Sequence, residues 1–87
     1  MKHLTLLALF AALPAYAEIE GYDWDTGNYV EINAQWLTEG DNVEMYDYDT
    51  GDYHDVDIQS VDRYGLTVEA EVYDNTTGEY RTIDLEK

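Results

Sequence analysis

An eight-residue box, Tyr-Asp-x-x-Thr-Gly-x-Tyr, occurs three times in this chain of 87 residues, at Tyr22–Tyr29, Tyr46–Tyr53 and Tyr73–Tyr80. The same residue types recur at the same box positions in all three copies, which indicates a true internal repeat. This repeat constrains the fold more than any other feature, because one local structure must form three times within a short chain.

The middle of each box has the chemistry of a tight hairpin turn. Its Asp is expected to accept backbone N–H groups two and three residues further on, while its Thr closes the turn. Its Gly supplies the left-handed backbone conformation that other residues resist. Each box therefore predicts a β-hairpin with a four-residue loop.

This turn fixes which residues face each other across each hairpin. Side chains alternate between the two faces of a strand, so each hairpin has one aliphatic face and one face of tyrosines and acids. The third hairpin also places Glu71 opposite Thr82 and Glu69 opposite Asp84. The predicted tyrosine pairs are Tyr22–Tyr29, Tyr46–Tyr53 and Tyr73–Tyr80. The acid pairs beside the first two are Glu20–Glu31 and Glu44–Asp55.

The aliphatic faces supply enough side chains for one small core if the sheet curls on itself. Trp36 and Leu37, in the longest connection, are expected to plug one open end. We predict an all-β domain at residues 18–87, a six-stranded antiparallel meander of three hairpins that closes into a small SH3-like barrel. The expected core is Ile19, Val30, Ile32, Val43, Met45, Val56, Ile58, Leu66, Val68, Ala70, Val72, Ile83 and Leu85.

Residues 1–17 have the pattern of a signal peptide. A short positive start is followed by the apolar run Leu4–Leu13, by Pro14, and by Ala15-Tyr16-Ala17, which matches a small-x-small cleavage site. This run is too short to cross a bilayer, and an ordinary N-terminal core helix does not require these flanks. We therefore expect cleavage between Ala17 and Glu18, and a soluble mature protein in the periplasm or outside the cell.

The charge of the chain excludes several classes of function. Twenty Asp and Glu against four Lys and Arg give a formal net charge of -16, which does not suit nucleic acid or an anionic membrane surface. With no Cys and two His, the chain has no disulfide framework and no thiolate zinc site. We expect no cofactor and no insertion into a membrane.

The face of tyrosines and acids is the candidate binding surface. Like charges opposite each other destabilise a sheet, yet the register sets acid against acid beside the tyrosine pairs. Carboxylates and aromatic ring faces both attract Lys, Arg and polyamine-like cations. A basic protein segment or a polyamine is thus the expected partner of Tyr22, Tyr29, Glu20, Glu31, Tyr46, Tyr53, Glu44, Asp55, Tyr73 and Tyr80.

Two other interpretations stay open. The same face can be a solvated sheet surface in a structural or stress-related exported protein without a discrete ligand. The Asp residues of the boxes superficially resemble calcium loops, but Gly comes at the wrong position and no bidentate Glu follows, so only weak divalent-cation binding is expected.

Catalysis has little support in the sequence. His54 and Ser60 are the only His and Ser of the mature chain, and the register turns His54 toward the aliphatic side, as a hydrogen-bonded strand residue. Arg81, opposite Val72, is expected to be a snorkelling edge residue paired with a nearby acid. We therefore predict a protein that is not an enzyme.

The whole mature chain resembles an uncharacterised family of small exported bacterial proteins, a domain of unknown function with the same repeated boxes. The boxes Tyr22–Tyr29, Tyr46–Tyr53 and Tyr73–Tyr80, behind a signal peptide, carry this resemblance. It implies export and a similar architecture. It transfers no site residue, since the family has no assigned activity.

Overall fold

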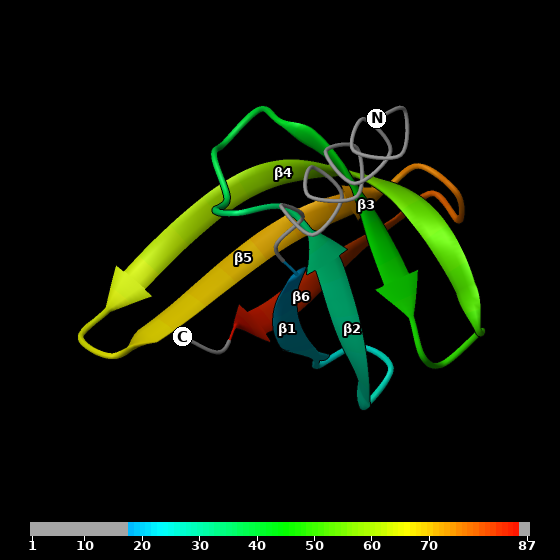
Figure 1. Cartoon of the computed structure of the whole chain (residues 1–87), viewed down its shortest axis with the longest axis horizontal. Helices are drawn as coiled ribbons and strands as arrows, with labels where there is room; N and C mark the ends of the chain where they lie inside the picture. The colour runs from blue at the N-terminus through cyan, green and yellow to red at the C-terminus, as the bar shows by residue number, and fades with distance from the viewer. Residues whose placement is uncertain (1–17, 86–87) are drawn as a thin grey trace, which may run out of the picture.

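Six β-strands make up residues 18–85, the part of the chain that the computed structural model describes (Figure 1). Every neighbouring pair is antiparallel, and the last strand returns to pair with the first, so the sheet is a closed barrel. The predicted all-β meander that closes into a small barrel is confirmed. The strands are β1 (Glu18–Asp23), β2 (Asn28–Asn33), β3 (Asn42–Asp47), β4 (Asp52–Tyr64), β5 (Thr67–Asp74) and β6 (Glu79–Leu85).

Each box forms the predicted hairpin turn. The N–H of Gly27 donates to the carbonyl of Asp23 at 2.8 Å, and the other two boxes repeat this bond at 2.7 Å. The three box glycines have φ between 75° and 80°, which is the left-handed region. Each box Asp accepts the N–H two residues on at 2.8 Å, whereas only Asp74 also reaches the N–H three residues on. The second of the two predicted side-chain bonds is therefore wrong for the first two boxes.

The predicted register is confirmed in all three hairpins. Tyr22 pairs with Tyr29, and the carboxylate pairs follow on the same face of the strands. The second and third hairpins repeat this arrangement residue by residue. The predicted turn thus sets the pairing, because shifting a strand by one residue would move its apolar side chains out of the core.

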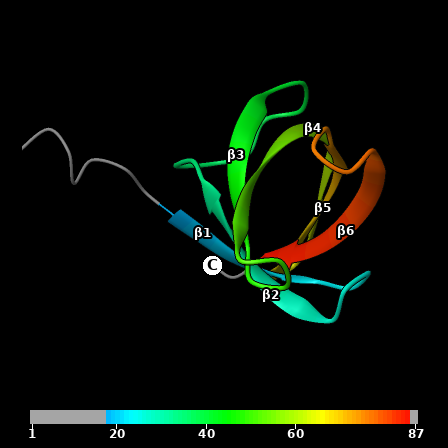
Figure 2. The ribbon, with the colours of Figure 1, turned by 90° about the vertical axis from the view of Figure 1, so that its right-hand side faces the viewer.

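The barrel closes where β1 meets β6, and Figure 2 shows the strands curving around a ring. Gly21 of β1 pairs with Leu85 of β6 at this seam. A Cβ atom at Gly21 would lie 2.5 Å from Cγ2 of Ile83 and 3.0 Å from the carbonyl oxygen of Asp84. The close approach of the two backbones therefore requires glycine here.

The strands β4 and β5 form a long arm that extends beyond the other strands (Figure 1). The register of the pair shifts between Ile58 and Ser60, which marks a β-bulge. Leu66 lies at the turn of this arm and is 89% exposed, so its predicted place in the core is wrong. Val61, on the same arm, packs against the core instead.

The core lies inside the barrel, where the aliphatic faces of all six strands meet. Met45, Ile32 and Ile83 are completely buried, while Ile19 and Val43 are partly buried against the core. Leu37 closes part of the barrel as predicted, but Trp36 is 69% exposed and does not plug it. The remaining buried aliphatic side chains are those of Val30, Val56, Ile58, Val68, Ala70, Val72 and Leu85.

The expected signal peptide and its cleavage site before Glu18 lie almost entirely outside the described residues and remain a prediction. Within residues 18–85, the structure contains no helix of the length and apolar character needed to span a membrane.

Candidate binding site

The three tyrosine pairs lie on the outer wall of the barrel as edge-to-face ring pairs. The ring centroids are 5.5 Å apart in Tyr22–Tyr29, 5.0 Å in Tyr46–Tyr53 and 4.9 Å in Tyr73–Tyr80. In each pair the second tyrosine is 57 to 61% exposed, whereas the first is half-buried. This geometry is favourable for aromatic pairs and leaves ring surface open to a partner.

Two of the boxes add a third aromatic ring to the pair. Trp24 packs edge-on against Tyr22 at 5.2 Å, and Tyr48 packs in the same way against Tyr46 at 4.8 Å. The third box has Asn75 at this position, so its tyrosine pair stays alone. The first two hairpins therefore present larger aromatic surfaces than the third.

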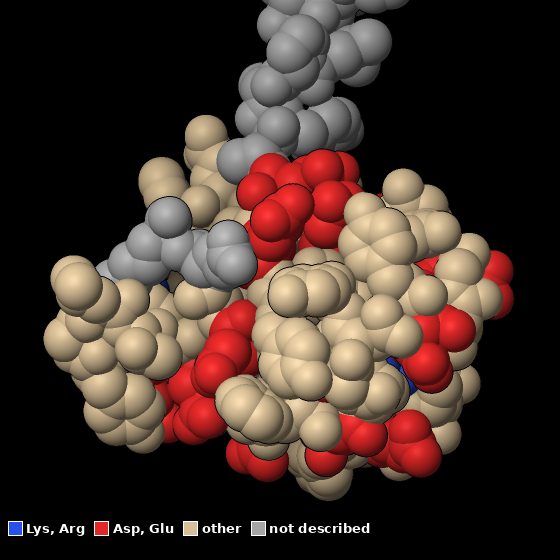
Figure 3. All heavy atoms as spheres, turned by 90° about the horizontal axis from the view of Figure 1, so that it is seen from below, with Lys and Arg blue, Asp and Glu red and all other residues tan. Residues whose placement is uncertain are grey.

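The predicted acid pairs also lie on the outer wall. Glu20 faces Glu31 and Glu44 faces Asp55, with both side chains of each pair exposed or half-buried. All ion pairs among residues 18–85 involve His54 or Arg81, so these four carboxylates have no cationic partner there. Figure 3 shows acidic side chains in several clusters around one side of the molecule, where hardly any Lys or Arg surface is visible.

The closed barrel distributes the ten predicted site residues around its wall. A groove of about 520 Å³ brings Glu20, Tyr29 and Glu31 together with Tyr48, Asn28 and Val30. Glu31 also lies opposite Tyr46, where β2 pairs with β3. The groove does not include the other predicted residues, which are Tyr22, Tyr46, Tyr53, Glu44, Asp55, Tyr73 and Tyr80.

Tyr48 belongs to this groove although the sequence interpretation did not include it. Its backbone N–H donates to the carbonyl of Tyr29 at 3.2 Å, which fixes the second box turn against β2. A hydrogen bond to the Glu31 carboxylate, together with the negative charge of that group, raises the pKa of the Tyr48 hydroxyl. The sequence feature that could have indicated Tyr48 is the third box position, which is aromatic in two of the three copies.

A second hollow, of about 680 Å³, opens at the end of the barrel away from the box turns. Ile19, Leu37, Val68 and Leu85 provide its apolar surface. Its other lining residues are Glu18, Glu20, Glu31, Gln35, Trp36 and Arg63. Because Glu20 and Glu31 line both hollows, the two lie next to each other on the surface.

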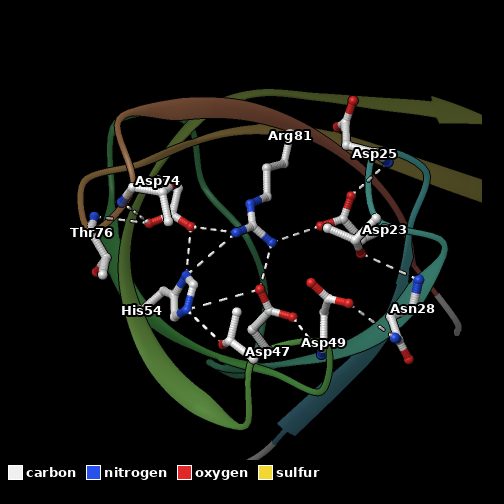
Figure 4. Close-up of polar contacts among 12 residues, drawn as sticks. Asp23, Asp25, Asn28, Asp47, Asp49, His54, Asp74, Thr76 and Arg81 are labelled. Carbon is white, nitrogen blue, oxygen red and sulfur yellow. Dashed lines mark hydrogen bonds and ion pairs between the residues drawn. The ribbon is translucent and has the colours of Figure 1, made fainter.

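The opposite end of the barrel is closed by a buried ionic cluster, which we define as Asp23, Asp47, Asp74, His54 and Arg81 (Figure 4). Nη1 of Arg81 donates to Oδ2 of Asp23 at 2.9 Å and to Oδ2 of Asp47 at 2.7 Å. Its Nη2 lies 2.9 Å from Oδ2 of Asp74. One arginine thus binds the turn aspartates of all three boxes.

His54 completes the cluster from β4. Its Nδ1 lies 2.6 Å from Oδ2 of Asp74, and its Nε2 lies 3.0 Å from the hydroxyl of Thr50. Burial opposes ionisation of Asp74, but hydrogen bonds from His54, Thr76 and Thr77 outweigh it and lower the pKa of this carboxyl. Burial also disfavours the charged form of Arg81. The hydrogen bonds to Asp47 and Asp23 outweigh this effect and raise the pKa of the guanidinium.

The cluster corrects one expectation and supports another. Arg81 is 3% exposed and bound by three acids, so it is not a snorkelling edge residue. His54 is buried and hydrogen-bonded, as the register predicted. None of its hydrogen bonds in the described part of the chain reaches Ser60, which pairs with Glu71 further along β4.

The turn aspartates use their oxygens within the protein. One oxygen of each accepts a turn N–H and the other binds Arg81. Across residues 18–85, no group of three or more His, Cys, Asp or Glu side chains has an arrangement that could hold a metal ion.

Together, the fold and the groove define a small acidic β-barrel whose outer wall carries aromatic rings beside carboxylates. The chain belongs to DUF5334, a family of unknown function, whose family model matches residues 19–87. The expected membership of a domain family without an assigned activity is thereby confirmed. Searches of curated proteins and of solved structures gave no match.

Proposed function

We propose that this protein is a non-enzymatic binding module of the cell envelope that holds a basic segment of a partner protein. The site is the groove lined by Glu20, Tyr29, Glu31 and Tyr48, which we call the tyrosine–carboxylate groove. The signal-peptide pattern of residues 1–17 supports a location in the periplasm or outside the cell.

One observation carries this proposal. Glu20 and Glu31 face each other across β1 and β2 beside two aromatic rings, and no Lys, Arg or His among residues 18–85 pairs with them. Like charges directly opposite each other destabilise a sheet, so a bound cation would remove an existing repulsion. The rings of Tyr29 and Tyr48 add a cation–π attraction to the same ligand.

The groove favours a cation on a side chain or a flexible chain over a free metal ion. Its walls combine carboxylates with apolar ring surface, which accommodates the methylene stem of Lys or Arg as well as the charged end. A polyamine shares this chemistry and serves as a second probe. Structural assembly through sheet edges is the competing function, and closure of the barrel leaves few such edges.

The direct test is calorimetric titration of the mature protein with a short peptide of alternating Lys and Gly, and separately with spermine. We expect binding of the peptide at low salt and its loss at about 0.5 M salt, where exposed charges are screened beyond about 4 Å. The double variant Glu20→Gln/Glu31→Gln is expected to weaken binding about tenfold.

The matched control is Glu69→Gln/Asp84→Asn. It removes another like-charged pair from opposite strands, but this pair does not line the groove. Retained affinity in the control and lost affinity in the groove variant support the proposal. Equal losses in both variants would show that net charge alone attracts the peptide, and a peptide that does not bind at low salt would refute the proposed function.

A further inference from the structure

We propose that the partner segment carries an apolar side chain next to its basic residues, and that this side chain inserts into the open mouth of the barrel. The inference rests on the proposed function and specifies the chemistry of the partner. The mouth is the hollow of about 680 Å³ lined by Ile19, Leu37, Val68 and Leu85, with Trp36 and Arg63 beside it.

The mouth is where aliphatic side chains of the core line a hollow at the surface. Leu37, Val68 and Leu85 belong to the core cluster, and Ile19 packs against it. All four line this hollow, whereas the ionic cluster closes the opposite end of the barrel. Trp36, a large aromatic side chain at the same hollow, is 69% exposed and is not covered by any described residue.

The charge of the shared lining and the position of the mouth beside the groove identify the occupant. Glu20 and Glu31 lie between the mouth and the tyrosine–carboxylate groove and line both. An extended segment bound across these two carboxylates therefore has its cationic side chains beside Tyr29 and Tyr48, with the mouth next to them. Side chains of an extended strand alternate in direction, so a neighbouring apolar residue can turn into the mouth while the basic residues stay on the acids. A purely basic segment would leave the apolar mouth empty.

The test compares two forms of the alternating Lys–Gly peptide, one with Leu and one with Ser in place of its central Gly. We expect the Leu peptide to bind about tenfold more tightly, as burial of one aliphatic side chain implies. In the variant Trp24→Phe, which leaves Trp36 as the only tryptophan, the Leu peptide is expected to shift the fluorescence emission to shorter wavelength and the Ser peptide to leave it almost unchanged.

The variant Trp36→Ser is expected to abolish the preference for Leu. Leu66→Ser is the matched control. Leu66, near the tip of the arm, is an exposed apolar residue like Trp36, but it does not line the mouth. Equal affinity for the two peptides, or a preference that survives Trp36→Ser, would overturn the inference and leave the proposed function intact. Failure of both peptides to bind at low salt would overturn the proposed function and the inference with it.

Discussion

Acidic side chains have opposite surroundings inside and outside this barrel. Inside, Asp23, Asp47 and Asp74 are completely buried and share Arg81. Outside, Glu20 faces Glu31, and within residues 18–85 no cation neutralises this pair. The carboxylates that stabilise the fold therefore have their counter-ion within the chain, whereas those of the groove have none among residues 18–85, and the proposed partner would supply it.

The position along the strand explains this division. The box Asp has the same orientation as the aliphatic residues, so each hairpin turns it into the barrel, while the glutamates alternate to the outer wall. Buried ionised groups are stable only when hydrogen bonds and opposite charges surround them. Arg81 pairs with all three aspartates, and His54 forms a further hydrogen bond with Asp74, so the three repeats depend on one another.

The largest effect is expected from Arg81→Met. This variant leaves three buried carboxylates without their guanidinium, and breaking a buried pair in this way costs about 3–5 kcal/mol. That loss is comparable to the total stability of so small a domain, so we expect the variant to be unfolded in water. Urea titration monitored by circular dichroism measures it.

The matched control for this variant is Arg63→Met, which removes an exposed arginine of the arm. We expect its unfolding midpoint to stay close to that of the wild type. If Arg81→Met unfolded at the same urea concentration as the control, the ionic cluster would not stabilise the fold.

A smaller loss is expected from Asp74→Asn. The amide can still accept the turn N–H groups. The ion pair with Arg81 is lost, and the hydrogen bond with His54 no longer involves a carboxylate, which together costs about 1–3 kcal/mol. Asp62→Asn, which changes an exposed acid of β4, is expected to stay within about 0.5 kcal/mol of wild type. Equal stability of the two variants would contradict the distinction between inner and outer carboxylates.

Acid should destabilise the ionic cluster through Asp74. Since the folded protein lowers the pKa of Asp74, this group stabilises the fold above its unfolded pKa of about 4 and loses that contribution as the pH falls further. We expect the melting temperature of the wild type to drop below about pH 4, and that of Asp74→Asn to drop less. Melting curves recorded between neutral pH and about pH 3 compare the two, and parallel curves would rule out the assigned role of Asp74.

The smallest effect, and one of opposite sign, is expected from Glu20→Gln/Glu31→Gln. Removal of a like-charged cross-strand pair relieves repulsion and should stabilise the free protein by about 0.2–1 kcal/mol. Urea unfolding at low salt detects this gain, which should shrink at about 0.5 M salt. A destabilised double variant would show that these glutamates serve the fold rather than a partner.

The sequence predicted the hairpins well because turn chemistry and strand alternation are local. The box turns fixed every pair in the three hairpins, and aliphatic patterning indicated closure into one core. The same alternation places Asp23 on the side of Val30 and Arg81 on the side of Ile83. The inward direction of the ionic cluster was thus available from the register, although its convergence on one guanidinium depends on barrel closure.

Residues outside the hairpins were less predictable. Trp36 and Leu66 lie outside the segments whose register the box turns set. Tertiary packing alone decides that both are exposed. Prediction of the groove also required the pairing between strands of different hairpins. Glu31 and Tyr48 come from different hairpins and meet only because β2 pairs with β3.

The most direct test of the central claim is a backbone NMR titration of the mature protein with the alternating Lys–Gly peptide at low salt. The proposed binding site predicts that the amide signals of Glu20, Tyr29, Glu31 and Tyr48 shift most and return to their free positions at about 0.5 M salt. Signals that do not move, or changes centred on the hairpin of Tyr73 and Tyr80, would contradict it.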